Sequence, residues 1–264
     1  MKVYLKSIAK LSRLDDEPAY RDFMNPMEAR RMSRMMKKAI VVSSMALRDA
    51  GISVPDAIIT GTGLGSLENT EAFLMALRGV TEDAPRPTNF MQSTHNTPGS
   101  LIGIRTADHG YNATYANLGT SFESAMLDAW MQIRLGEIGN ALVSAFEELT
   151  PTFSHMLEKT GYKGTFIDGT LSETAVSVVL SSDKEGAICE VEDIDLLSED
   201  DGMDTAGATV LNREEYCAVF GENYSASALG FALGVEKILG GTQRVIVNND
   251  FRGEQFARII LRRI

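Results

Sequence analysis

Cysteine and histidine are scarce in this chain of 264 residues, which contains two cysteines and three histidines. Cys189 and Cys217 are too few for a disulfide framework, and no C-x-x-C or Cys/His spacing is typical of a metal site. We therefore expect neither a metal nor another cofactor. The chain also lacks an apolar run near the roughly 20 residues that cross a bilayer. Its first residues, MKVYLKSIAKLSRL, lack the continuous apolar stretch of a signal peptide. These absences predict a cytoplasmic protein without a membrane span.

Basic residues are also few, because 25 Lys and Arg stand against 36 Asp and Glu, a formal net charge of −11. Nucleic acids are bound through clustered Lys and Arg, so this balance argues against a nucleic-acid partner. One dense basic run, RRMSRMMKK at residues 30–38, could attract an acidic partner or form a solvated helix face. Its basic residues are Arg30, Arg31, Arg34, Lys37 and Lys38.

The apolar pattern alternates between strand-like and helix-like segments, which is typical of an α/β protein. Gly51 ends the first long helix, and the prolines and glycine between 81 and 99 indicate a loop. The acidic run 198–204 indicates a second loop. The predicted strands are 2–10, 56–60, 140–146, 174–181, 244–249 and 257–264, and the predicted helices are 28–50, 67–78, 121–135 and 226–239.

A repeated order of elements points to duplication. The helices that end at Leu135 and Leu239 are 104 residues apart, and so are the strands that begin at Ala141 and Val245. A second apolar strand follows in each case. A helix–strand–strand unit used twice predicts a duplicated α/β architecture.

The stretch YANLGTSFESAMLDA, residues 115–129, predicts a strand that passes through a tight turn into a helix. Thr120 or Ser121 can cap that helix. Many α/β enzymes hold a nucleophile at such a junction, because the helix N-terminus favours developing negative charge. Here the sharpest point of the turn is Gly119, which has no side chain.

Other polar motifs admit ordinary structural interpretations. GTGLGS, residues 61–66, follows a strand and precedes a helix, as a nucleotide-binding loop does, but its spacing is G-x-G-x-G and favours a structural turn. The three histidines, His95, His109 and His155, lie in predicted loops, and none follows residue 155. A carboxylate pair could form among Glu147, Glu148 and Glu173.

Taken in order, several segments resemble the β-ketoacyl synthases of the thiolase fold along nearly the whole chain. YSASALGFALGVEKIL is similar to the family's helix that begins K-S-x-x-G-H-x-x-G-A-A-G, and VIVNNDFRGEQFARIIL to its closing N-S-F-G-F-G-G-x-N strand pair. The other matching segments are RRMSRMMKKAIVVSSMALRDAG, IITGTGLGSLENTEAF, STHNTPGSLIGI through NALVSAFEE, and LSETAVSVVL.

The resemblance implies a thiolase-like α/β fold with duplicated halves, whose mixed five-stranded sheets are layered between helices. It implies one domain over 1–264, with a first half of about 1–182 and a shortened second half of about 183–264. In this alignment Gly119 occupies the position of the nucleophilic cysteine and Ser227 that of the second catalytic histidine. Thr205 stands loosely at the first histidine position. The resemblance therefore implies a family member that lacks its catalytic residues.

This pattern implies a pseudoenzyme that acts as the chain-length-factor-like subunit of a heterodimeric type II ketosynthase in polyketide or fatty-acid-like biosynthesis. The short form and STHNTPGSLIGI resemble the subunits of aryl-polyene and flexirubin-type pigment pathways. The implied partners are an active synthase, or a second copy of the chain in a homodimer, and an acyl-carrier protein that contacts the basic run. The expected interface and tunnel residues are Tyr115, Ala116, Leu118, Phe122 and Met126.

Two other functions stay open. An acyltransferase or thioesterase could use Ser121 with His95 or His109, although a hydroxyl without a paired base is a poor nucleophile. A nucleotide-binding module could use GTGLGS.

Overall fold

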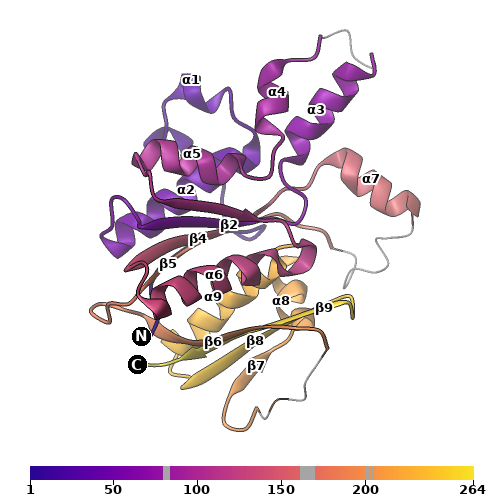
Figure 1. The fold of residues 1–264 in the computed structure, drawn as a ribbon. Coiled ribbons are helices and arrows are strands. Elements are labelled where there is room, and N and C mark those ends of the chain that lie inside the picture. The colour runs from indigo at the N-terminus through magenta and orange to yellow at the C-terminus, as the bar shows by residue number, and fades with distance from the viewer. Residues whose placement is uncertain (80–83, 161–169, 200–202, 204) are drawn as a thin grey trace.

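The computed structural model describes residues 1–79, 84–160, 170–199, 203 and 205–264. Their strands form two layers (Figure 1). One layer contains five strands and the other four, and a short pairing between Tyr4–Leu5 and Cys189–Glu190 joins them into one nine-stranded ladder. In ladder order the strands are β3 (Tyr111–Tyr115), β2 (Ala57–Gly61), β4 (Asn140–Glu147), β5 (Thr174–Ser181), β1 (Tyr4–Leu11), β6 (Cys189–Leu197), β9 (Gln255–Arg262), β8 (Arg244–Phe251) and β7 (Thr209–Leu211).

The helices form an outer and a central layer. On the outer face of the first layer of strands lie α2 (Arg34–Ala50) and α5 (Thr97–Thr106), and between the two layers lie α6 (Ser121–Leu135) and α9 (Ala226–Leu239) (Figure 1). The remaining described helices are α1 (Pro26–Ala29), α3 (Leu67–Leu77), α4 (Pro87–Gln92), α7 (Pro151–Thr160), α8 (Arg213–Phe220) and the 3-10 turns Tyr20–Asp22 and Leu118–Thr120.

The central helices are held by apolar burial on both sides. Phe122 of α6 meets Phe231 of α9 edge to face, with ring centroids 5.7 Å apart, and neither residue is exposed. Burying a phenylalanine stabilises the fold by about 1.5–3 kcal/mol. All eight residues of β5 are buried, which is typical of a strand covered on both faces. On the outer layer, Ser33 caps the start of α2 and Gly51, at φ +70°, ends it.

The predicted duplication is confirmed. The unit α6–β4–β5 recurs as α9–β8–β9, and in each unit the two strands pair antiparallel. A parallel strand flanks each first strand, β2 beside β4 and β7 beside β8. The chain thus has the expected duplicated α/β fold with a shorter second half. The second layer has four described strands where five were expected, in keeping with that shortening.

Several elements were not expected from the sequence. The predicted loop 81–99 contains α4 and the start of α5, each with a proline in its first turn, where a missing N–H costs nothing. The strand β6 and helices α7 and α8 were also missed, and most of the acidic run 198–204 lies outside the described residues. None of the described helices is both long and apolar enough to cross a membrane.

Candidate functional site

The turn between β3 and α6 has the strained geometry of a nucleophile-bearing junction. Leu118 adopts φ +49°, a left-handed conformation that bulky residues avoid, and its side chain is 47% exposed. Gly119 follows and is buried. The Ser121 hydroxyl stabilises the turn by accepting from the Asn117 amide at 2.8 Å and by lying within donating distance of the Thr62 carbonyl oxygen at 3.1 Å. The expected tight turn is therefore present, and Gly119 lies directly before the N-terminus of α6.

The phenyl ring of Phe251, from the second half of the chain, fills the space beside Gly119. A Cβ atom on Gly119 would lie well under 3.0 Å from Cγ, Cδ1 and Cδ2 of Phe251, closer than real Cβ atoms approach. Phe251 is itself buried and packs on Tyr224, with ring centroids 5.3 Å apart. A cysteine at 119 would collide with this ring, so the structure gives a steric reason for glycine at the expected nucleophile position.

The backbone of Gly119 is also fully bonded. Its N–H donates to the Gln255 side-chain oxygen at 3.0 Å, and its carbonyl oxygen accepts from Asn249 Nδ2 at 2.7 Å. Gln255 Nε2 further donates to the Asn117 carbonyl oxygen at 3.2 Å. An amide at a helix N-terminus can stabilise an oxyanion only when it is free to donate to it. Here the Gln255 side chain of β9 occupies that amide.

A buried polar network lies behind Phe251. Arg213 makes a two-pronged ion pair with Glu222, donates to Asn249 Oδ1, and places its guanidinium 4.9 Å from the centre of the Phe251 ring. Asn249 Nδ2 donates to Glu123 Oε1 at 2.9 Å. The pair is buried, so loss of either partner would leave an uncompensated charge. The network fixes Asn249 and Phe251 against the turn.

Ser227, expected at the second histidine position, lies at the start of α9 and is fully buried beside Glu123. Burial raises the pKa of Glu123, and the Ser227 hydroxyl partly opposes this shift. Among the described residues, neither Glu123 Oε2 nor Ser227 Oγ has a hydrogen-bond partner of ordinary geometry. No imidazole is available here to move a proton.

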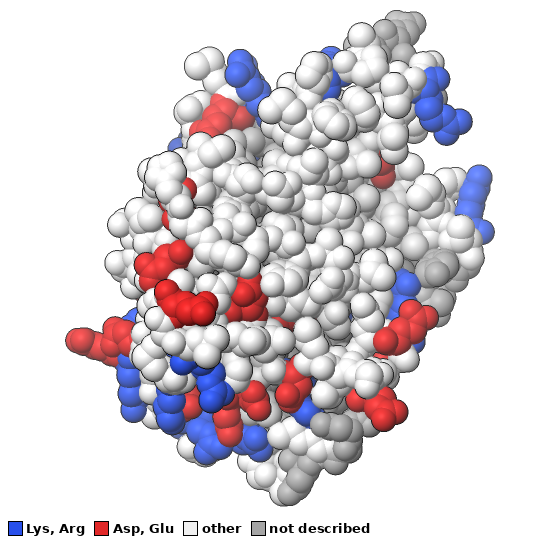
Figure 2. Space-filling model, viewed as in Figure 1, with Lys and Arg blue, Asp and Glu red and all other residues white. Residues whose placement is uncertain are grey.

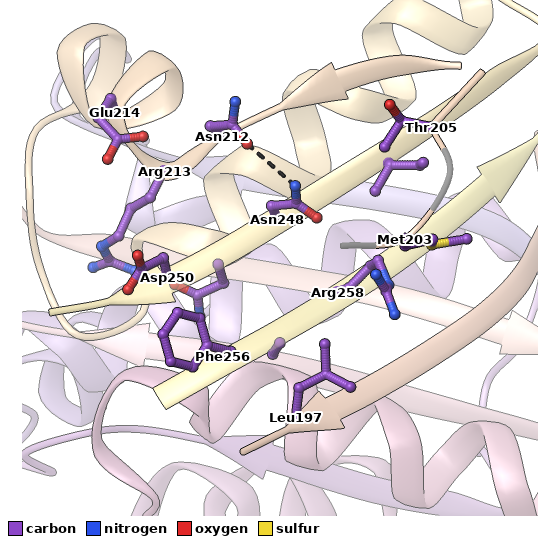
Figure 3. A pocket seen from close by; sticks show the side chains of 13 residues that line it. Leu197, Met203, Thr205, Asn212, Arg213, Glu214, Asn248, Asp250, Phe256 and Arg258 are labelled. Atoms are coloured by element: carbon purple, nitrogen blue, oxygen red, sulfur yellow. Dashed lines mark hydrogen bonds between the residues drawn. The ribbon is translucent and has the colours of Figure 1, made fainter. Parts of the chain in front are cut away.

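Thr205, expected at the first histidine position, lines a cavity of about 340 Å³ over the second layer of strands (Figure 3). The same cavity is bordered by Asn248, whose Nδ2 donates to Asn212 Oδ1 at 3.2 Å, and by Arg258, which pairs with Asp195. Within the described part of the chain, no hydrogen bond links Thr205 to Gly119 or Ser227.

The glycine-rich loop GTGLGS binds a carboxylate of the chain itself. The amides of Gly63 and Leu64 donate to Glu147 at 2.8 and 3.0 Å, and the Glu68 amide donates to Glu148 at 2.9 Å. Burial raises the pKa of Glu147 to about 7 and that of Glu148 to about 7. Because these amides are already used, the geometry favours a structural turn over a phosphate-binding loop.

The expected interface residues divide into two groups. Tyr115 is half-buried, and Ala116 and Leu118 are exposed, along the edge formed by β3 and the following turn. Phe122 and Met126 are fully buried within the core between the layers. Among the described strands β3 pairs only with β2, so its outer edge is unpaired. In the view of Figure 2, the upper centre of the molecule carries few charged side chains.

The basic run is partly neutralised within the chain. Arg34 and Lys38 both pair with Glu173, at 2.9 and 3.0 Å, and Lys38 is buried. Lys37 lies over the Tyr20 ring, 5.3 Å from its centroid. The two arginines that precede them, Arg30 and Arg31, are exposed.

Ser121 has no histidine beside it in the described part of the chain, because its hydroxyl contacts only backbone groups. The imidazole of His95 packs on Gly65 instead. This arrangement does not favour a relocated serine–histidine pair.

Four residues of the site were not identified from the sequence: Phe251, Gln255, Asn249 and Arg213. One signal was available, because a glycine at a tight junction often marks a close approach by another group. The sequence does not say which group approaches.

Comparison with known proteins was made by sequence and by structure. A family model described as the N-terminal domain of β-ketoacyl synthase matches residues 7–234. No curated protein matches the chain.

Solved structures match over the whole chain. One is described as a type II PKS acyl-carrier protein in complex with its ketosynthase bound to the hexaketide (AntDE:AntF). It gives a TM-score of 0.82 at 14% identity, over 100% of this chain and 99% of that chain. The ishigamide ketosynthase/chain length factor gives 0.81 at 14% identity, over 100% of both chains. The ketosynthase ApeO in complex with its chain length factor ApeC from Xenorhabdus doucetiae gives 0.70 at 12% identity, over 100% and 98%. At these identities the likeness shows a shared fold.

Proposed function

The chain belongs to the β-ketoacyl synthase family, and we propose that it performs no condensation itself but serves as the chain-length-factor-type subunit of a separate, active ketosynthase. The observation that carries this proposal is the Phe251 ring packed on Gly119. A synthase needs a thiolate that accepts the acyl chain, and the nucleophile position has neither a thiol nor room for one.

The remaining chemistry of the site supports the same conclusion. Decarboxylation of an extender unit needs groups that stabilise the resulting oxyanion. Ser227 and Thr205 stand at the expected histidine positions, and the Gly119 amide already donates to Gln255. The two cysteines of the chain do not compensate, because both are buried, and burial raises the pKa of the Cys189 thiol to about 12 and that of Cys217 still further.

The unpaired edge of β3 is the proposed site of assembly. An edge strand presents backbone donors and acceptors that a partner strand can satisfy. Tyr111 and Leu118, both large and partly apolar, are exposed beside it. An obligate interface of this kind should bury on the order of 2,000 Å² or more. The structures of ketosynthase with chain length factor that share this fold support a partner of the same fold.

The acyl-carrier protein is the proposed second partner, and Arg30 and Arg31 are its proposed contact, because the other charges of the basic run are engaged within the chain. The proposed products are polyketides or specialised fatty acyl chains, with aryl polyenes as the narrower assignment on the resemblance of STHNTPGSLIGI.

Co-purification tests the proposal. The tagged chain, expressed in its source cell, should retain a ketosynthase with an intact cysteine and two histidines, identified by mass spectrometry. Ala116→Arg, which places a charge at the strand edge, should release it, whereas Arg48→Glu on the exposed end of α2 should not. Full activity of the synthase without this chain would refute the assignment.

A further inference from the structure

A carboxylate without a cation lies beside the proposed assembly edge. Asp128 of α6 is half-buried, accepts from the Tyr111 hydroxyl at 3.0 Å, and accepts from Gln132 Nε2 at 2.8 Å. The Asp128 charge also acts on Tyr115, because burial and then that charge raise the pKa of the Tyr115 phenol to about 12. Within the described parts of the chain, no Lys or Arg lies within ion-pair distance of Asp128.

The two tyrosines locate this charge on the strand. Tyr111 and Tyr115 are the first and last residues of β3, so their side chains leave the same face of the sheet, the face toward α6. Asn112 points to the opposite face, where its Nδ2 donates to the Gly99 carbonyl oxygen. Because Asp128 accepts from the Tyr111 hydroxyl and its charge also acts on the Tyr115 phenol, we place the carboxylate under β3, between the two tyrosines.

The placement of Asp128 under β3 has a consequence for pairing between two copies of the chain. Two copies that paired antiparallel through β3 would be related by a two-fold axis between the strands, so a group near the middle of β3 would lie close to its own copy. Paired strands lie about 4.8 Å apart. The two Asp128 carboxylates would therefore lie on the same face of the paired strands, one on each side of the axis, and the partner strand would remove water that screens them.

We propose that Asp128 determines the choice of partner: it opposes pairing of the chain with itself, and it receives a lysine or arginine side chain of the ketosynthase. This inference rests on the proposed function, because it assumes pairing through β3. Like charges placed in a desolvated contact are an effective means of excluding a wrong partner. A cation on the right partner turns the same carboxylate into an attraction.

The test compares self-association in sedimentation equilibrium. The wild-type chain should be monomeric at micromolar concentration, and Asp128→Asn should self-associate at least tenfold more tightly. Asp49→Asn, on the exposed end of α2 (Asp49 45% exposed by side chain), removes the same charge elsewhere and should behave as wild type. Equal association of wild type and D128N, or a stable wild-type dimer, would overturn the proposal.

A charge swap keeps the test valid if D128N is poorly folded. Asp128→Lys mixed with the wild-type chain should associate more tightly than either chain with itself, because opposite charges then face across the axis. Failure of the mixture to associate, with both chains folded by circular dichroism, would count against the inference.

Capture of the ketosynthase separates the two proposals. We expect wild type to bind it and D128N to bind at least tenfold more weakly. If wild type binds and D128N binds equally well, the role of Asp128 is refuted and the proposed function survives. If no synthase is captured although D128N self-associates, the proposed function fails and the lysine or arginine contact fails with it, whereas the opposition of Asp128 to self-pairing is upheld.

Discussion

Gly119→Ala probes the fit between the turn and Phe251. The added methyl group would lie well under 3.0 Å from three ring atoms. The Phe251 ring has little room to move away from residue 119. Tyr224 packs against it with ring centroids 5.3 Å apart, and the Arg213 guanidinium lies 4.9 Å from its centre. Overpacking a core typically costs about 1–3 kcal/mol, and this restraint places G119A at the upper end, about 3 kcal/mol less stable.

A double-mutant cycle isolates the contact. Phe251→Ala removes a buried ring and should cost about 3–5 kcal/mol by itself. Once the ring is gone, the methyl group at 119 has room, so G119A/F251A should be about as stable as F251A. The two substitutions would then be coupled by about 3 kcal/mol, as expected for residues in direct contact.

Urea unfolding followed by circular dichroism measures these differences. Gly240→Ala is the matched control, because Gly240 has φ −72° and its Cβ would meet only ordinary contacts at 3.4 Å. That substitution should change stability by no more than about 0.5 kcal/mol. A G119A variant as stable as wild type, or additive effects of G119A and F251A, would refute the steric explanation for glycine at the nucleophile position.

Three further predictions concern the glycine-rich loop, the buried network and the core. Burial raises the pKa of Glu147 from 4.5 to about 7, so the stabilisation linked to its bound proton is complete below pH 4.5 and is lost as pH rises through 7. Glu147→Gln should therefore flatten the fall in the urea midpoint between pH 5 and 8, and an unchanged slope would contradict this. Arg213→Met leaves Glu222 buried without its cation and should cost about 3–5 kcal/mol in thermal unfolding, partly recovered in Arg213→Met/Glu222→Gln; wild-type stability would contradict the network. Phe122→Ala should cost about 3–5 kcal/mol, because the ring packs in the core against Phe231; a stable variant whose complex makes longer products would instead place Phe122 in the tunnel.

The fold could be predicted largely because its repeat is visible in the sequence. The 104-residue offset between helices ending at Leu135 and Leu239 reflects two units of equal topology. The strand β6 escaped prediction because its sequence, CEVEDIDLL, alternates apolar and acidic residues, and an acidic edge is also typical of a solvated loop. Helices α4 and α5 escaped because their prolines indicate loops when context is unknown.

The candidate site could be predicted only in part. The sequence reveals that Gly119 has no thiol, but the ring that fills its space belongs to a residue 132 positions later in the chain, and only the folded hairpin of β8 and β9 brings it there. The surroundings of Asp128 likewise depend on another element, because Tyr111 of β3 donates to this carboxylate of α6. Contacts between distant segments leave no local pattern in a single sequence.

The central claim is that this chain never carries the growing acyl group. Intact-protein mass spectrometry of the complex during turnover, with the acylated carrier protein and a malonyl extender, tests it most directly. The account predicts that the acyl mass appears on the ketosynthase partner and that this chain keeps its unmodified mass. An acyl adduct on any residue of this chain, formed and discharged at the rate of product formation, would contradict it.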